Sequence, residues 1–92
     1  MALFMVIERF RNGDPAPIYD RFAQCGRMMP DDVQYVNSWI SQDRTICYQV
    51  MEAARAEDLQ PWMDKWSDLM EFTVVPVMTS AEAVALAAAD LA

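Results

Sequence analysis

The sequence predicts an α+β domain in which a four-stranded antiparallel sheet carries two helices on one face. Two runs, 2–7 and 72–78, are apolar at successive positions, which is typical of strands covered on both sides. Two further strand-like runs flank the polar turn 42–44, and this spacing indicates a hairpin. Helical patterns follow the first and third strands. These observations predict the order β-α-β-β-α-β, with one more helix at the end.

The first predicted strand spans residues 2–10, and a turn then leads to a helix at 15–26. Asp14 is the expected N-cap of this helix, and the proline after it suits a first helical turn. Gly26 is the expected end of the helix. The apolar side chains of the strand divide between its two faces, with Leu3, Met5 and Ile7 on one face and Phe4 and Val6 on the other. The helix has one apolar stripe, made of Ile18, Phe22, Cys25 and Met29.

The predicted hairpin joins strands at 33–41 and 45–52. A second helix is predicted at 58–69, with Asp58 as its cap. Within this helix Trp62 and Trp66 lie one turn apart in an apolar stripe, which favours a role as core anchors over a recognition pair.

The last predicted strand spans 71–78, and a third helix spans 80–91. Pro76 lacks a backbone N–H, which places the last strand at a sheet edge or at a bulge. Thr79 and Glu82 have the spacing of a capping box at the start of the third helix. This helix is apolar nearly all round, so we expect it to pack on something.

With right-handed crossovers, these elements form a single ferredoxin-like domain over residues 1–92, with sheet order 4-1-3-2. Both main helices then lie on one face, and the other face is open although it is apolar. We expect the open face to meet its copy in a homodimer that forms an α+β barrel. The alternative is that the terminal helix folds over the open face, which would then need no partner.

Composition and charge exclude several classes of partner. The chain has 14 acidic and 7 basic residues, and the basic residues are scattered, so neither nucleic acid nor an anionic membrane surface is an expected partner. The longest apolar run is much shorter than a membrane span, and the start of the chain lacks the basic segment of a signal peptide. Cys25 and Cys47 are expected to be buried thiols in a reducing cytoplasm, without a disulfide.

The sequence contains no histidine, which removes the most common metal ligand and the usual general base near neutral pH. It also lacks a glycine-rich phosphate loop, so we expect no metal site and no cofactor. Glu8 and Glu52 each follow apolar strand residues, and a carboxyl group in an apolar pocket exchanges protons near neutrality. Both carboxylates could instead be solvated strand ends or ion-pair partners, for example Glu8 with Arg44.

A second group of candidates lies on the predicted hairpin. Tyr35, Asn37 and Trp39 are expected to share one face of its first strand, and Tyr48 lies on its second strand. Tyrosine and tryptophan need a partner for their polar tip when buried, and they often line ligand pockets. The alternative is that they pack in the core or in a dimer interface. With the two carboxylates, the candidate pocket residues are Glu8, Tyr35, Asn37, Trp39, Tyr48 and Glu52.

Several segments of the chain resemble a bacterial family of unknown function, the domain-of-unknown-function family numbered 3303. They are MALFMVIERF followed by NGDP, GRMMP followed by YVNSW, CYQVME, and WMDKWSDLMEFTVVPVMTSAEA. The family resembles a branch of the dimeric α+β-barrel superfamily, which includes small monooxygenases, haem-degrading enzymes and muconolactone-isomerase-like enzymes. The resemblance therefore implies this fold and a tendency to dimerise, but it implies no reaction.

Two functions follow from these observations. The first is a small cytoplasmic homodimer that binds a small apolar ligand or a protein partner without catalysis, favoured because the chain has no nucleophile and base pair. The second is a cofactor-independent enzyme of the barrel type, an isomerase or monooxygenase that acts on a small apolar or aromatic substrate. The candidate pocket residues would serve either function.

Overall fold

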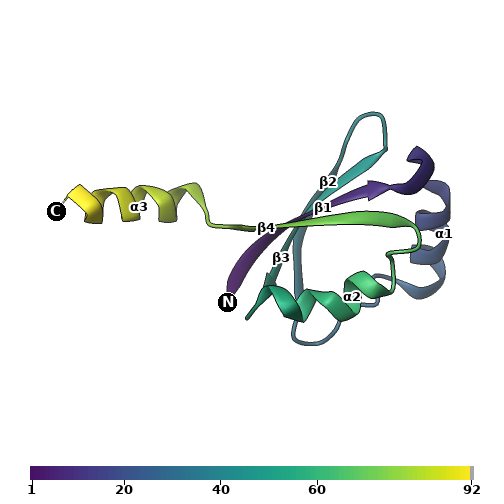
Figure 1. The fold of residues 1–92 in the computed structure, drawn as a ribbon, viewed down its shortest axis with the longest axis horizontal. Helices are drawn as coiled ribbons and strands as arrows, with labels where there is room; N and C mark the ends of the chain where they lie inside the picture. The colour runs from purple at the N-terminus through teal and green to yellow at the C-terminus, as the bar shows by residue number, and fades with distance from the viewer. Residues whose placement is uncertain (92) are drawn as a thin grey trace.

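The computed structural model describes residues 1–91 and shows a four-stranded antiparallel sheet with strand order β2-β3-β1-β4, accompanied by α-helices (Figure 1). This order is the predicted 4-1-3-2 read from the other edge, and it fits a ferredoxin-like fold. The strands are β1 (Ala2–Phe10), β2 (Gln34–Ile40), β3 (Ile46–Ala53) and β4 (Met70–Val77). The α-helices are α1 (Ala16–Cys25), α2 (Gln60–Asp64) and α3 (Ser80–Leu91), and short 3₁₀ helices span Arg11–Gly13 and Ala56–Leu59.

The centre of the sheet is β1, which pairs with β3 on one side and β4 on the other. Pro76 lies opposite Phe4 on β4, and β4 is an edge strand, as its missing N–H predicted. The other edge is β2, which has a bulge between Tyr35 and Asn37. A bulge shifts the alternation of side chains by one position, so residues before and after it point to different faces.

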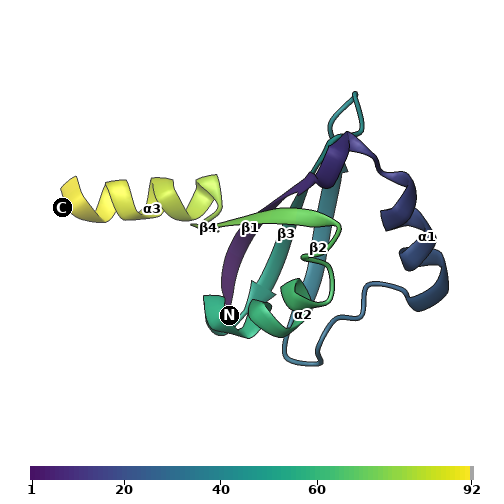
Figure 2. The same ribbon diagram turned by 45° about the vertical axis from the view of Figure 1, so that its right-hand side comes forward.

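The helices α1 and α2 lie on the same side of the sheet (Figure 2). Phe4 and Val6 face them and are buried, whereas Leu3, Met5 and Ile7 are half-buried on the other face. Trp62 and Trp66 are buried in the same core, which confirms their predicted role as anchors, and Trp62 meets Phe72 edge to face at 5.4 Å. The largest fully buried side chains are Val6, Met51 and Leu59.

The second helix is shorter than the predicted range 58–69. A 3₁₀ turn, in which Asp58 accepts a hydrogen bond from the Arg55 backbone N–H, precedes α2, and α2 ends at Asp64. Beyond that point the backbone continues in turns, with bonds such as Leu69 N–H to the Trp66 carbonyl. The tighter turns bring the chain into β4 within a few residues while Trp66 stays in the core.

The stripe predicted on the first helix is only partly buried. Ile18 reaches the core, but Phe22 is 43% exposed and Cys25 is exposed, so the expected burial of the Cys25 thiol is wrong. The helix ends at Gly26 as predicted, since the Gly26 N–H donates to the Phe22 carbonyl and the residue has a positive φ. The second half of the predicted apolar stripe on α1 is therefore not packed in the core.

The third helix extends away from the rest of the molecule (Figure 1). Its capping box is present as predicted, with the Glu82 N–H donating to the Thr79 hydroxyl at 3.1 Å. All its described residues are exposed, including Val84 and Leu86, so the structure shows no packing partner for it within residues 1–91. It does not cover the open face of its own sheet. None of the helices described is long and apolar enough to cross a membrane.

We call the side of the sheet opposite α1 and α2 the open face. Apolar side chains of all four strands lie on it, and several of them are well exposed, as Trp39 is at 54%. The largest are Met5, Ile7, Trp39, Tyr48 and Val75.

Candidate functional site

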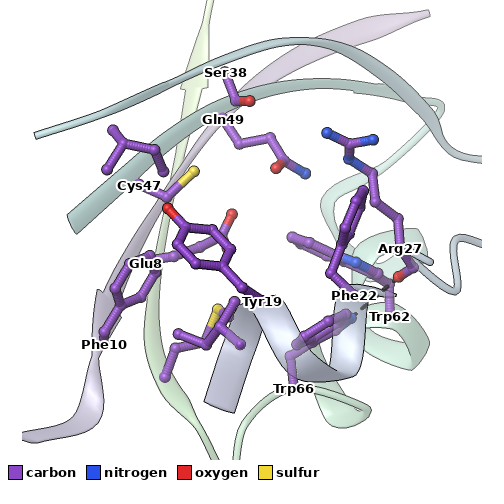
Figure 3. A pocket seen from close by; sticks show the side chains of 13 residues that line it. Glu8, Phe10, Tyr19, Phe22, Arg27, Ser38, Cys47, Gln49, Trp62 and Trp66 are labelled. Atoms are coloured by element: carbon purple, nitrogen blue, oxygen red, sulfur yellow. Dashed lines mark hydrogen bonds between the residues drawn. The ribbon is translucent and has the colours of Figure 1, made fainter. Parts of the chain in front are cut away.

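A cavity of about 260 Å³ lies between the sheet and α1, and its floor reaches α2 (Figure 3). Its walls are mainly apolar and aromatic, with a few polar groups among them. The apolar wall consists of Phe10, Ile18, Phe22, Ile40, Trp62, Trp66 and Met70. The polar wall consists of Glu8, Tyr19, Arg27, Ser38, Cys47 and Gln49.

Polar contacts hold α1 and the segment after it against the chain that follows α2. Arg21 forms a two-pronged ion pair with Asp68, with both N···O distances 2.7 Å. After α1, the Arg27 carbonyl accepts a hydrogen bond from the Trp66 indole at 3.1 Å. On the sheet below, Ser38 and Cys47 are too small to fill the space left under the helix.

Glu8 is the most unusual group in the cavity. The alternation of β1 places it between Val6 and Phe10 on the helix-covered face, where it is only 5% exposed and lies opposite Cys47 of β3. Its Oε2 atom is buried without a hydrogen-bond partner among residues 1–91. Burial raises its pKa to about 7, although a hydrogen bond from the Cys47 thiol and the charge of Arg27 act in the opposite direction. The carboxyl group therefore exchanges its proton near neutral pH.

The Cys47 thiol does not provide a nucleophile in this setting. Burial, reinforced by the negative charge of Glu8 and the hydrogen bond to it, raises the pKa of Cys47 to about 12. Because only a thiolate attacks readily, Cys47 remains a small, weakly polar part of the wall.

Two further polar groups of the wall, the Gln49 amide and the Trp62 indole N–H, differ in their hydrogen bonding. The Gln49 amide nitrogen contacts the Met51 sulfur at 3.3 Å, which is a weak acceptor. The Trp62 indole N–H is buried and, within residues 1–91, meets no acceptor. A buried donor without an acceptor costs about 1–3 kcal/mol, so such groups are rare unless something else satisfies them.

Arg27 lies beside the cavity in the segment after α1. Its guanidinium carbon is 3.8 Å from the centre of the Tyr35 ring and 5.1 Å from the centre of the Phe22 ring. In the described part of the chain, the ion pairs use Arg11, Arg21 and Arg55, and Arg27 has no carboxylate partner. Figure 3 shows the Arg27 and Glu8 side chains reaching the cavity from different walls.

The structure divides the six candidate residues between the two faces of the sheet. Glu8 lines the cavity, and Tyr35 lies next to it through Arg27 and a 2.7 Å hydrogen bond with Ser38. The other four candidates, Asn37, Trp39, Tyr48 and Glu52, lie on the open face.

The prediction that Tyr35, Asn37 and Trp39 share a face is wrong because of the bulge in β2. Tyr35 pairs with Met51, whose side chain is in the core, whereas Asn37 pairs with Val50 and Trp39 pairs with Tyr48. The suggested ion pair of Glu8 with Arg44 does not form, since the residue opposite Glu8 is Cys47.

Sequence reasoning missed several residues of the cavity wall, among them Arg27, Ser38 and Gln49. A signal for Gln49 was present, because it shares the inward face of its strand with Cys47 and Met51 and is polar. Arg27 carried no such signal, since its position depends on how the segment after α1 returns to β2.

The chemistry available in the cavity is that of hydrogen bonding and proton exchange. Residues 1–91 contain no group of three or more histidine, cysteine, aspartate or glutamate side chains arranged to hold a metal ion. The cavity instead combines a carboxyl group that changes charge near neutrality, a guanidinium and an indole N–H with a largely aromatic wall.

Comparison with known proteins identifies the family of the chain. Neither the curated proteins nor the solved structures include a match to it. A family model described as a domain of unknown function (DUF3303) matches residues 2–91, which is nearly the whole chain. The chain therefore belongs to the DUF3303 family.

Proposed function

We propose that this protein binds a small, largely apolar molecule in the cavity between the sheet and α1. The observation that carries the proposal is that two residues of the mainly apolar and aromatic wall, Glu8 and Trp62, each have a buried polar atom without a hydrogen-bond partner in residues 1–91, Glu8 Oε2 and Trp62 Nε1. Each costs free energy while it has no partner. A ligand that offers one donor or acceptor to them removes that cost and also buries its apolar part against aromatic rings.

The size of the cavity limits the ligand to a small molecule. An engineered cavity of about 150 Å³ in another protein holds benzene. The cavity here is about 260 Å³, which suits one substituted ring or a short acyl chain. Trp62 and Trp66 lie in the wall, so a ligand in contact with them changes the tryptophan fluorescence.

The experiment is a thermal-shift and tryptophan-fluorescence screen with small aromatic and acyl compounds. The variant Ser38→Leu fills part of the cavity and is expected to weaken any ligand found. The matched control is Gln34→Leu on the same strand, whose side chain is exposed and opposite Glu52 on the open face. Binding that survives Ser38→Leu but is lost in Gln34→Leu would place the ligand elsewhere and contradict the proposal.

We propose further that the protein forms a homodimer through the open face. The support is the continuous apolar surface of Met5, Ile7, Trp39 and Val75 on that face, together with the exposed apolar residues of α3. Contiguous apolar surfaces that remain accessible often mark interaction sites. Light scattering at micromolar concentration should give twice the chain mass of 10.5 kDa, and a mass of 10.5 kDa would contradict the dimer.

A second candidate function is proton transfer on a bound substrate, as in a cofactor-independent isomerase. The observation that favours it is Glu8, whose pKa of about 7 suits a general acid or base. Once a ligand is known, proton exchange of its acidic C–H groups with deuterated water can be followed by NMR. Exchange that the protein accelerates, and that Glu8→Gln abolishes without loss of binding, would support catalysis. Binding without exchange would leave the protein as a binding module.

A further inference from the structure

We propose that the ligand of this cavity is an apolar acid, bound as its carboxylate between the guanidinium of Arg27 and the carboxyl group of Glu8. This inference rests on the proposed function and names the class of molecule that the cavity takes. The apolar part of the ligand would lie against Phe22, Trp62 and Trp66.

Arg27 supplies the positive charge that such a ligand requires. Its guanidinium packs against the Tyr35 and Phe22 rings, at 3.8 and 5.1 Å from their centres. The N–H donors of a guanidinium lie in its plane, so ring packing on its faces leaves the edges available to a carboxylate. By contrast, the guanidinium of Arg21 already donates hydrogen bonds to the carboxylate of Asp68. Arg27 is thus a cation in the cavity wall that forms no ion pair with any carboxylate of residues 1–91 and can bind an anionic ligand.

The other polar groups of the wall also favour an acceptor. Glu8 in its protonated form donates an O–H, and the buried Trp62 indole N–H can only donate. A neutral ligand would leave the charge of Arg27 without a partner, and an amine would be repelled by it. A carboxylate offers two oxygen atoms with several acceptor positions, enough for Arg27 and at least one of the other donors.

The charge of the whole protein opposes the approach of an anion, since the chain carries −7. Over distances greater than about 8 Å, however, physiological salt screens such interactions. The contacts inside the cavity therefore decide affinity, and the net charge acts mainly on the rate of association.

The proposed geometry makes binding depend on pH through Glu8. The other titratable or charged groups that face Glu8 across the cavity are Tyr19 from α1, Arg27 after α1 and Cys47 from β3. Burial holds the pKa of Cys47 at about 12, which keeps this thiol neutral near pH 7. Glu8 is protonated below its pKa of about 7 and can then donate its O–H to the ligand carboxylate, whereas above that pKa its negative charge repels the ligand.

The test compares three probes of one shape, benzoate, benzamide and benzylamine, by calorimetry and tryptophan fluorescence at pH 6 and pH 8. Benzoate should bind best at pH 6 and about tenfold more weakly at pH 8, because the protonated fraction of Glu8 falls from about nine-tenths to about one-tenth. Benzamide should bind more weakly than benzoate at pH 6 and show no such dependence.

Two variants and a control locate the effect. Arg27→Gln should weaken benzoate at pH 6 by about tenfold or more and leave benzamide little changed, since a charged hydrogen bond is lost. Glu8→Gln, a permanent neutral mimic of the protonated acid, should remove the pH dependence and keep benzoate bound at pH 8. Arg44→Gln removes one positive charge from an exposed hairpin turn and should leave all affinities unchanged. Circular dichroism checks that each variant is folded.

The outcomes separate this inference from the proposed function. Benzylamine binding better than benzoate, or benzoate binding better at pH 8 than at pH 6, would contradict the inference that the ligand is an acid. The proposed function, a cavity that binds a small molecule, would still stand. Equal binding of all three probes with no effect of Arg27→Gln would contradict the same inference. Failure of all three probes, and of the wider aromatic and acyl panel, to bind the folded protein would instead overturn the proposed function itself.

Discussion

The two faces of the sheet carry similar apolar side chains but meet different surroundings. On the covered face, β1 contributes Phe4 and Val6, which are buried under the helices. On the open face, β1 contributes Met5 and Ile7, which are only half-buried. The difference shows that a strand with apolar side chains on both faces does not by itself tell which face the helices cover. On the covered face, Glu8 interrupts the series of apolar side chains, and it lines the cavity.

The largest expected effect comes from placing a charge on each face of β1 in turn. Val6→Asp puts a carboxylate at a position with 0% exposure and should destabilise the fold by more than about 4 kcal/mol. Ile7→Asp is its neighbour on the open face and should leave a folded protein that does not form the proposed dimer. Urea unfolding and light scattering measure the two effects. A folded Val6→Asp variant, or a dimeric Ile7→Asp variant, would contradict the distinction between the faces.

The next largest effect concerns the cavity on the covered face, where Glu8 should make the free energy of unfolding depend on pH. The pKa of Glu8 rises from 4.5 to about 7 on folding, so folding favours the protonated form. The stability that this supplies is complete below pH 4.5 and is lost as the pH rises through 7. Between about pH 5.5 and pH 8 the free energy of unfolding should fall by about 2 kcal/mol.

Glu8→Gln is the control for this loss, because its amide does not titrate. Asp43 and Asp68 have lowered pKa values through hydrogen bonds to Ser41 and Arg21, so their contributions change below pH 3.8, outside the window. Urea unfolding at both pH values measures the difference. An equal loss in the wild type and in Glu8→Gln would show that Glu8 is not the group responsible.

The same comparison shows what the sequence could and could not predict. Alternation and turn chemistry were enough to predict the order of the strands and the edge position of β4 from Pro76. The bulge after Tyr35 left no pattern in the sequence, and it placed Tyr35 and Asn37, which were expected on one face, on opposite faces. Arg27 could not be assigned to the cavity, because its place depends on tertiary contacts such as the Trp66 hydrogen bond to its carbonyl.

A smaller effect concerns α3, whose start depends on local hydrogen bonds alone. Thr79→Ala removes the hydroxyl that accepts the Glu82 N–H and should destabilise the helix by about 1 kcal/mol. An isolated helix of this length is marginal in water, so NMR chemical shifts should show a clear loss of helicity in residues 80–91. The unfolding of the sheet and its helices should not change. A lower midpoint in urea for the whole protein would mean that α3 packs against the body.

The smallest expected effect on stability is that of removing α3 altogether. Within residues 1–91 the helix makes no packing contact with the body, and Val84 and Leu86 are exposed on it. Truncation after Met78 should therefore change the free energy of unfolding of the monomer by less than about 0.5 kcal/mol. If α3 adds to the dimer, truncation should still weaken dimerisation, and the full-length variant with Val84→Glu and Leu86→Glu should weaken it equally. Unchanged dimerisation in both variants would assign the dimer to the open face alone, since the apolar side chains of that face would then suffice without the helix.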